Sequence, residues 1–198
     1  LVARRPKQWI KNLLVVAVPL AAGQLLNPEI MARTALAFFA MCAAASAVYL
    51  TNDILDREAD RNHPKKQYRP IAAGNVSVPT AATTALLLAV VAVTVPALLG
   101  SAALSLLILG YLALQATYVF WAKHQPVLDL ACVASGFVLR AVAGGVAAEL
   151  SISVWFLTVT AAAAMFVVSG KRYSELVTHG HESGTRQGLK EYSEGYLR

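Results

Sequence analysis

The sequence has 198 residues, of which 57% are hydrophobic and only 14% are charged, and its mean hydropathy is +0.56. This composition excludes an ordinary soluble domain and is typical of a protein that crosses a membrane several times. The net charge of +6 does not indicate nucleic-acid binding, because the basic residues adjoin apolar segments. Cys42 and Cys132 lie inside such segments, which argues against a disulfide or a metal pair.

Six apolar stretches have the length of a membrane span, which needs about 20 mostly apolar residues. We place the spans at approximately residues 9–26, 31–51, 78–99, 102–121, 128–148 and 153–169. They predict an all-α fold, a polytopic membrane helical bundle that makes residues 1–198 a single transmembrane domain. Small residues such as Gly144 and Gly145 would let its helices approach closely.

The basic residues predict the orientation of this bundle. With six spans, fifteen of the seventeen Lys and Arg residues fall on one side, Arg33 falls on the other, and Arg140 lies within the fifth span. The positive-inside rule makes the basic side cytoplasmic. We therefore expect a multi-pass protein of the cell (inner) membrane, with residues 52–77 as a catalytic cytoplasmic loop and residues 170–198 as a cytoplasmic basic segment.

The stretch from residue 52 to residue 70 carries the strongest chemical signal. Asp53, Asp56 and Asp60 stand at i, i+3 and i+7, so on a helix they fall within roughly 60° of one another. Three carboxylates so close together repel unless a cation lies between them. Because Mg²⁺ prefers carboxylate oxygens together with substrate phosphates, we predict that these three residues are catalytic and bind Mg²⁺. A solvated, charged loop is the alternative, but it would need no such register.

Three further residues lie near or within the fifth span. Lys123 is placed either to bind a phosphate or only to orient the protein, and Asp129 needs a partner unless it caps the helix. Arg140 follows on the same helix face, about 16 Å deeper. It needs an acidic partner, a backbone carbonyl or a polar cavity, so a structural clamp and a cavity role both stay open.

Both ends of the sequence add candidates for ligand binding. Lys11 and Asn12 either belong to an interfacial anchor or face a cavity, and Lys171 either contacts lipid headgroups or binds a ligand. The whole set of substrate-binding candidates is Lys11, Asn12, Asn52, Arg57, Lys66, Arg69, Tyr118, Lys123, Asp129, Arg140, Lys171, Arg172 and Glu175.

The pattern Asn-Asp-x-x-Asp-x-x-x-Asp at residues 52–60, at the end of a second membrane helix, resembles the first aspartate-rich motif of the UbiA superfamily of intramembrane prenyltransferases. The resemblance covers the whole chain. Within the superfamily the chain is similar to the decaprenyl-phosphate phosphoribosyltransferases of actinobacterial cell-wall synthesis, over residues 5–12, 46–50, 63–74, 123–125, 140–147 and 170–176. The family fold has about nine membrane helices, so the resemblance implies a C-terminally truncated fragment with six of them.

The resemblance implies a Mg²⁺-dependent pentosyl transfer. A 5-phosphoribosyl group would pass from 5-phosphoribosyl diphosphate to decaprenyl (polyprenyl) phosphate, releasing diphosphate, in the synthesis of arabinan precursors. The expected partners are these two substrates and membrane lipids but no nucleic acid, and a homo-oligomer stays open.

Two other functions remain as alternatives. A UbiA-type transfer of a prenyl group from its diphosphate to an aromatic acceptor would need a second acidic motif, where this sequence has Lys171, Arg172 and a single Glu175. A transporter or channel would place its charges along a path through the bilayer, whereas only Arg140 is deep here.

Overall fold

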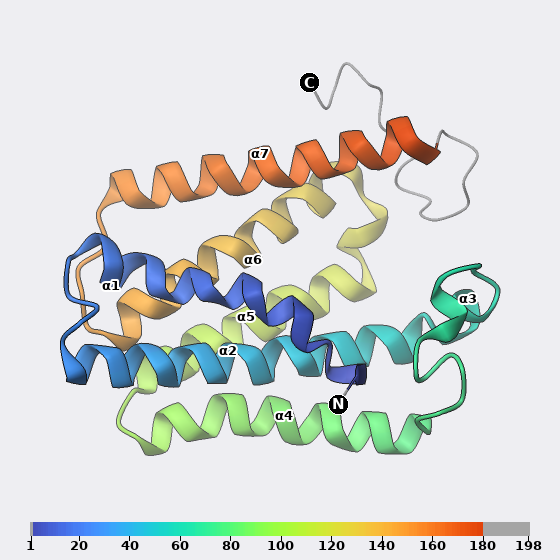
Figure 1. Ribbon diagram of the computed structural model, residues 1–198, viewed down its shortest axis with the longest axis horizontal. Helices are drawn as coiled ribbons and strands as arrows, with labels where there is room; N and C mark the ends of the chain where they lie inside the picture. The colour runs from blue at the N-terminus through green and yellow to red at the C-terminus, as the bar shows by residue number, and fades with distance from the viewer. Residues whose placement is uncertain (1, 180–198) are drawn as a thin grey trace.

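The computed structural model describes residues 2–179, and every regular element in this range is helical (Figure 1). The prediction of an all-α membrane bundle is therefore confirmed. Among the described residues, five helices are long and apolar enough to cross a membrane: α2 (Pro28–Leu55), α4 (Val78–Leu98), α5 (Ala102–Phe120), α6 (Pro126–Ala147) and α7 (Val154–His179). The shorter elements are the 3₁₀ helices η1 (Val2–Arg4), η2 (Pro6–Val16), η3 (Lys66–Tyr68) and η4 (Ala122–His124), with the α-helices α1 (Ala17–Ala21) and α3 (Arg57–Arg61).

The first four long helices lie within a few residues of the second to fifth predicted spans, and α7 extends ten residues beyond the end of the sixth at residue 169. The first predicted span is not one continuous helix. Its residues form η2 and then the short α1, which ends at a turn where Gly23 has a positive φ of 66°. Pro19 lies inside α1 and has no backbone N–H, so it cannot continue a regular hydrogen-bond ladder. Apolar length alone therefore overestimated the regularity of this segment.

Helix α2 forms the centre of the bundle, with α4 beside it and η2, α5 and α6 packed on its other sides (Figure 1). Its buried face is rich in small residues such as Ala37 and Ala44, which allow several neighbours to approach. Large side chains from α5, including Tyr111 and Ile108, pack against these small residues of α2 in the same core cluster. The outer faces of α4 and α7 expose apolar residues, as expected for surfaces in contact with lipid.

The N-terminal segment packs against both α2 and α6. Trp9 donates a hydrogen bond from Nε1 to Ser46 Oγ of α2 at 3.0 Å. On α6, a Cβ atom at Gly144 would lie only 1.7 Å from the carbonyl oxygen of Val15, so only glycine allows this approach of η2. These contacts fix the position of the basic residues of η2.

The fold brings several polar connections to one end of the bundle. The N-terminus, α3 and the start of α4 lie there with the ends of α2, α5 and α7, on the right in Figure 1. At the opposite end, Arg33 pairs with Glu29 at 2.7 Å and with Glu149 at 2.6 Å. That ion-pair group is exposed and ties the start of α2 to the turn before α7.

Candidate active site

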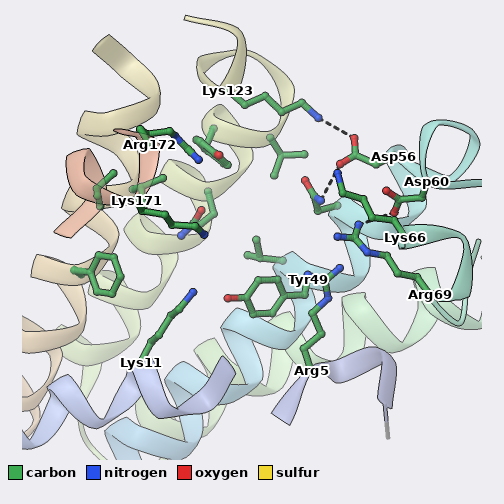
Figure 2. Close-up of a pocket in the computed structure, with 18 of the residues that line it drawn as sticks. Arg5, Lys11, Tyr49, Asp56, Asp60, Lys66, Arg69, Lys123, Lys171 and Arg172 are labelled. Atoms are coloured by element: carbon green, nitrogen blue, oxygen red, sulfur yellow. Dashed lines mark hydrogen bonds and ion pairs between the residues drawn. The ribbon is translucent and has the colours of Figure 1, made fainter. Parts of the chain in front are cut away.

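A cavity of about 730 Å³ opens among the helices at the polar end of the bundle. Its volume suits a small-molecule site, which typically spans about 300–1,000 Å³. Figure 2 shows charged side chains converging on it from η2, α3, α7 and the connections between helices. The predicted site residues that line it are Lys11, Asn52, Asp56, Asp60, Lys66, Arg69, Tyr118, Lys123, Arg140, Lys171 and Arg172.

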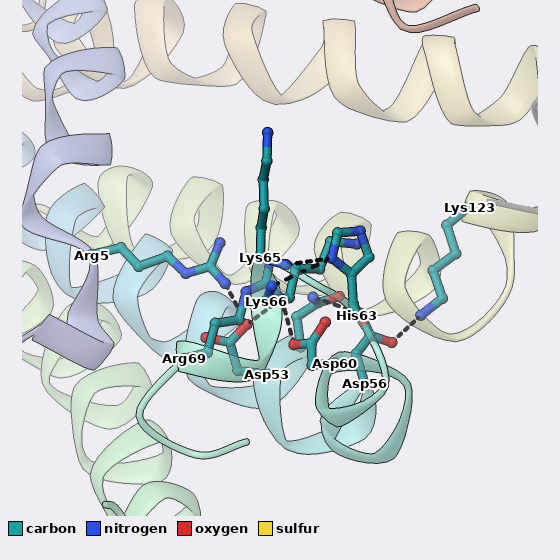
Figure 3. Close-up of polar contacts among 10 residues, drawn as sticks. Arg5, Asp53, Asp56, Asp60, His63, Lys65, Lys66, Arg69 and Lys123 are labelled. Carbon is teal, nitrogen blue, oxygen red and sulfur yellow. Dashed lines mark hydrogen bonds and ion pairs between the residues drawn. The ribbon is translucent and has the colours of Figure 1, made fainter. Parts of the chain in front are cut away.

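The three aspartates lie at a helix break and not on one continuous helix. Helix α2 ends at Leu55 and α3 begins at Arg57. Arg69 nevertheless donates from Nη1 to Asp53 at 3.2 Å and to Asp60 at 2.6 Å. Arg5 donates a second hydrogen bond to Asp53 (Figure 3). Both carboxylates are nearly fully buried. The chain thus supplies basic side chains next to each of these two carboxylates.

Asp56 is the most accessible of the three carboxylates, with 33% of its side chain exposed. Its Oδ1 accepts a hydrogen bond from Lys123 Nζ at 2.9 Å, and its Oδ2 accepts one from Asn52 Nδ2 at 2.9 Å. Lys123 belongs to η4, between α5 and α6. This ion pair therefore joins the end of α2 to the α5–α6 connection across the cavity (Figure 2).

The arrangement of carboxylates decides how a magnesium ion can fit. Within residues 2–179, no three His, Cys, Asp or Glu side chains are grouped closely enough to hold an ion by themselves. Asp56 and Asp60 line the cavity, whereas Asp53 lies behind Arg5 and Arg69. Because Mg²⁺ is usually bound by one or two carboxylates plus substrate phosphates, the residues fit a site that the substrate completes. The predicted set of three aspartate ligands is not assembled in this structure.

Asp129 is buried and does not line the cavity. Its carboxylate accepts two hydrogen bonds from Arg172, at 2.6 Å from Nε and 2.9 Å from Nη2, and a third from Tyr118 Oη at 3.0 Å. The three residues belong to α6, α7 and α5. Sequence reasoning proposed Asp129 as a substrate contact, but its hydrogen bonds hold Arg172 and Tyr118 at the cavity wall.

Arg140 lies deep in the cavity wall with 6% of its surface exposed. It donates from Nε to Asn12 Oδ1 at 2.8 Å, from Nη1 to the carbonyl oxygen of Gly136 at 2.6 Å, and from Nη2 to Tyr111 Oη at 2.8 Å. Of the partners left open by the sequence, the structure provides a carbonyl and a polar cavity. Asn12 donates in turn to Cys42 Sγ and lies behind the wall, not at its surface.

We expect Arg140→Lys to lower the free energy of unfolding by about 1–3 kcal/mol, because an ammonium group cannot reproduce three hydrogen bonds in the plane of a guanidinium. Thermal unfolding of the purified protein in detergent measures this change. Arg4→Lys is the matched control, since Arg4 is exposed. An unchanged stability of Arg140→Lys would contradict a clamping role.

Arg57 and Glu175 are the remaining predicted site residues. Arg57 does not line it and lies 3.6 Å from Glu58. The side chain of Glu175 lies outside the part of the chain that the structure describes.

Sequence reasoning missed several residues that line the cavity, among them Arg5, Tyr49, His63 and Tyr111. Arg5 reaches Asp53 only because η2 folds back along α2. No local sequence pattern predicts that contact. The tyrosines could have been noticed as polar groups within apolar segments.

Comparison with known proteins identifies the family of this chain. The chain belongs to the UbiA prenyltransferase family, whose model matches residues 13–173. It has a TM-score of 0.74 and 22% identity with a solved UbiA homologue from Archaeoglobus fulgidus bound to GPP and Mg²⁺, covering 88% of this chain and 62% of that one. The same homologue bound to DMAPP and Mg²⁺ gives a TM-score of 0.72 at 22% identity, with 94% and 65% coverage. These structures show the fold.

Curated relatives narrow the comparison to decaprenyl-phosphate phosphoribosyltransferases. The chain is 48% identical to that of Corynebacterium glutamicum over 99% of its own length and 60% of the relative's. The enzyme of Mycolicibacterium smegmatis is 47% identical, with 99% and 63% coverage. That of Mycobacterium tuberculosis is 44% identical, with 99% and 66% coverage. The chain thus spans less than two thirds of the length of these relatives.

Proposed function

We propose that this protein is a magnesium-dependent phosphoribosyltransferase that transfers a 5-phosphoribosyl group from 5-phosphoribosyl diphosphate to decaprenyl phosphate. Diphosphate is released, and the product feeds arabinan synthesis for the cell wall. The observation that carries this proposal is a membrane cavity in which Asp56 and Asp60 face a surplus of basic side chains. The similarity to curated enzymes of this name, at 44–48% identity, supports it.

The distribution of charge favours this reaction over prenyl transfer to an aromatic acceptor. The latter would need a second group of carboxylates opposite the first. On that side the described part of α7 contributes Lys171 and Arg172 to the cavity, and Arg172 is already paired with Asp129. A basic group suits a second phosphate-bearing substrate, because phosphate oxygens accept strong hydrogen bonds from Lys and Arg.

The reaction needs no strongly basic side chain. An oxygen of the lipid phosphate, already anionic at neutral pH, forms a bond to C1 of ribose while the bond from C1 to the diphosphate oxygen breaks. The diphosphate leaves with the electron pair. When bound, Mg²⁺ would neutralise charge on the leaving diphosphate. Asp56 and Asp60 are the residues that would hold it, and Lys66, Arg69 and Lys123 would bind the remaining phosphate oxygens.

The charges of the sequence support a location in the inner cell membrane with the cavity open to the cytoplasm. Fifteen of seventeen Lys and Arg residues belong to segments expected on that side. A soluble sugar diphosphate would enter from the cytoplasm, and the lipid phosphate would arrive within the membrane.

The test is a product assay with purified protein, radiolabelled 5-phosphoribosyl diphosphate and decaprenyl phosphate. We expect label in the lipid fraction with Mg²⁺ and none after chelation by EDTA. A parallel reaction contains geranylgeranyl diphosphate and 4-hydroxybenzoate. Prenylated benzoate without labelled lipid would overturn the proposal in favour of the aromatic prenyltransferase.

We expect Lys123→Ala to raise KM for the sugar diphosphate about tenfold or more, because a hydrogen bond from a charged donor to phosphate is lost. Initial rates over a range of donor concentrations measure this effect. Lys65→Ala is the matched control, since Lys65 is exposed and does not line the cavity. A loss of stability with an unchanged KM would instead assign Lys123 a structural role.

A further inference from the structure

The cavity has two walls of different composition. We call the first the aspartate wall: it comprises Asn52, Asp56, Asp60, Lys66 and Arg69, from the end of α2, from α3 and from the segment before α4. Its Arg69 is hydrogen-bonded to Asp60. Lys123 reaches this wall from η4 by its bond to Asp56. Arg69 and Lys123 are thus paired with the aspartate motif.

The facing wall is basic, and we define it by Lys11, Arg140, Lys171 and Arg172. Lys11 comes from η2, Arg140 from α6, and the other two from α7. Figure 2 shows Lys11, Lys171 and Arg172 across the cavity from Asp56 and Asp60. Within the described residues, the acidic side chains that line the cavity all belong to the aspartate wall.

An apolar strip continues directly from the basic wall. On α7, Val167 and Val168 line the cavity one turn before Lys171. On α6, Val133 and Phe137 line it and share a helix face with Arg140, whose guanidinium lies 5.8 Å from the centre of the Phe137 ring. The aspartate wall, by contrast, is mostly polar. A ligand held by the basic wall would therefore contact both cations and hydrocarbon.

The basic wall is also electrostatically suited to an anion. Lys11 is half-buried and lines the cavity together with the cationic side chains of Lys171, Arg140 and Arg5. Like charges gathered in a partly desolvated cavity repel one another, and a bound phosphate would turn that repulsion into attraction. On the aspartate wall the carboxylates of Asp56 and Asp60 themselves line the cavity, whereas Asp129, which pairs with Arg172 of the basic wall, does not line it.

We propose that the basic wall with its apolar strip is the acceptor subsite, which binds the phosphate of a polyprenyl phosphate and the first part of its hydrocarbon chain. This inference rests on the proposed function and adds a division of the cavity to it. The sugar diphosphate is held at the aspartate wall, and the lipid phosphate faces C1 of ribose from across the cavity. Lys11 and Lys171 are the principal contacts to the acceptor phosphate.

The test separates the two walls by binding alone. Isothermal titration of the purified protein in detergent measures Kd for geranylgeranyl phosphate without donor, and for 5-phosphoribosyl diphosphate with Mg²⁺ without acceptor. We expect Lys11→Met to weaken binding of the prenyl phosphate roughly tenfold and that of the sugar diphosphate less than about twofold. Lys123→Ala on the opposite wall should weaken binding of the sugar diphosphate roughly tenfold and that of the prenyl phosphate less than about twofold.

A third arm of the titration uses inorganic phosphate as a competitor. We expect it to displace geranylgeranyl phosphate only weakly, because it gains nothing from the apolar strip. The subsite would be overturned if inorganic phosphate competed as strongly as unlabelled geranylgeranyl phosphate. It would also be overturned if Lys11→Met lowered the affinities for the prenyl phosphate and the sugar diphosphate by the same factor. Val168→Asp should weaken binding of the prenyl phosphate while leaving binding of the sugar diphosphate unchanged.

Failure of the proposed function gives a different result. If the wild-type protein binds geranylgeranyl phosphate through Lys11 but transfers no phosphoribosyl group, the function is wrong and the subsite for a prenyl phosphate stands. If transfer occurs and Lys11→Met leaves prenyl phosphate binding unchanged, the function stands and the subsite is wrong.

Discussion

Asp56→Asn is expected to lower turnover by more than about a hundredfold, since a lost metal ligand should cost more than the 10–100-fold typical of residues that only support a ligand. Asp56 lines the cavity with a third of its side chain exposed. The amide keeps the size of the side chain and can still accept a hydrogen bond from Lys123. The loss should therefore come from weaker metal binding and not from unfolding.

Two measurements examine Asp56→Asn separately. One is kcat at saturating substrates, and the other is the Mg²⁺ dependence of binding of the sugar diphosphate, which needs no turnover. Glu58→Gln is the matched control, because Glu58 is exposed on the adjoining α3 and pairs with Arg61. Normal activity of Asp56→Asn at limiting Mg²⁺ would remove Asp56 from the metal site.

Asp129→Ala is expected to lower the free energy of unfolding by about 3–5 kcal/mol, which is the typical cost of removing one partner from a buried ion pair. Arg172 would keep its charge in a buried position without the carboxylate that now receives two of its hydrogen bonds. Tyr118 would lose its acceptor as well. Thermal unfolding in detergent measures the effect.

The double variant Asp129→Leu with Arg172→Met tests whether the charge itself is the cause. Replacing a buried ion pair by apolar residues of similar size is often nearly neutral, so this variant should recover most of the stability. Glu149→Gln serves as the control, since its ion pair with Arg33 is exposed and should contribute less than about 1 kcal/mol. If Asp129→Ala and Glu149→Gln lower the free energy of unfolding equally, the ion pair of Asp129 with Arg172 is not essential for stability.

Five of the six predicted spans have counterparts among the long helices of the described residues, because apolar length depends on local composition, whereas the first forms η2 and the short α1. The position of Asp53, Asp56 and Asp60 at the end of the second long helix follows from the sequence in the same way. Their register also indicated that a cation must lie nearby. It could not indicate that Arg69 reaches Asp53 and Asp60 from the following segment.

The remaining partners depend on contacts between distant parts of the chain. Asp129 and Arg172 are 43 residues apart, and Arg140 is 128 residues from Asn12. Such pairs depend on how helices pack, which periodicity does not specify. The break between α2 and α3 was also unexpected, since the i, i+3 and i+7 spacing alone is compatible with an unbroken helix.

The packing of η2 against α2 and α6 has a practical consequence for the choice of an expression boundary. The family model begins at residue 13, yet the first twelve residues supply Arg5 and Lys11 to the cavity and Asn12 to the Arg140 guanidinium. An expression boundary drawn at the start of the family match would remove all three, although Val15, which meets Gly144, would remain. Conventional domain limits would thus yield a helical bundle that lacks part of its own binding site.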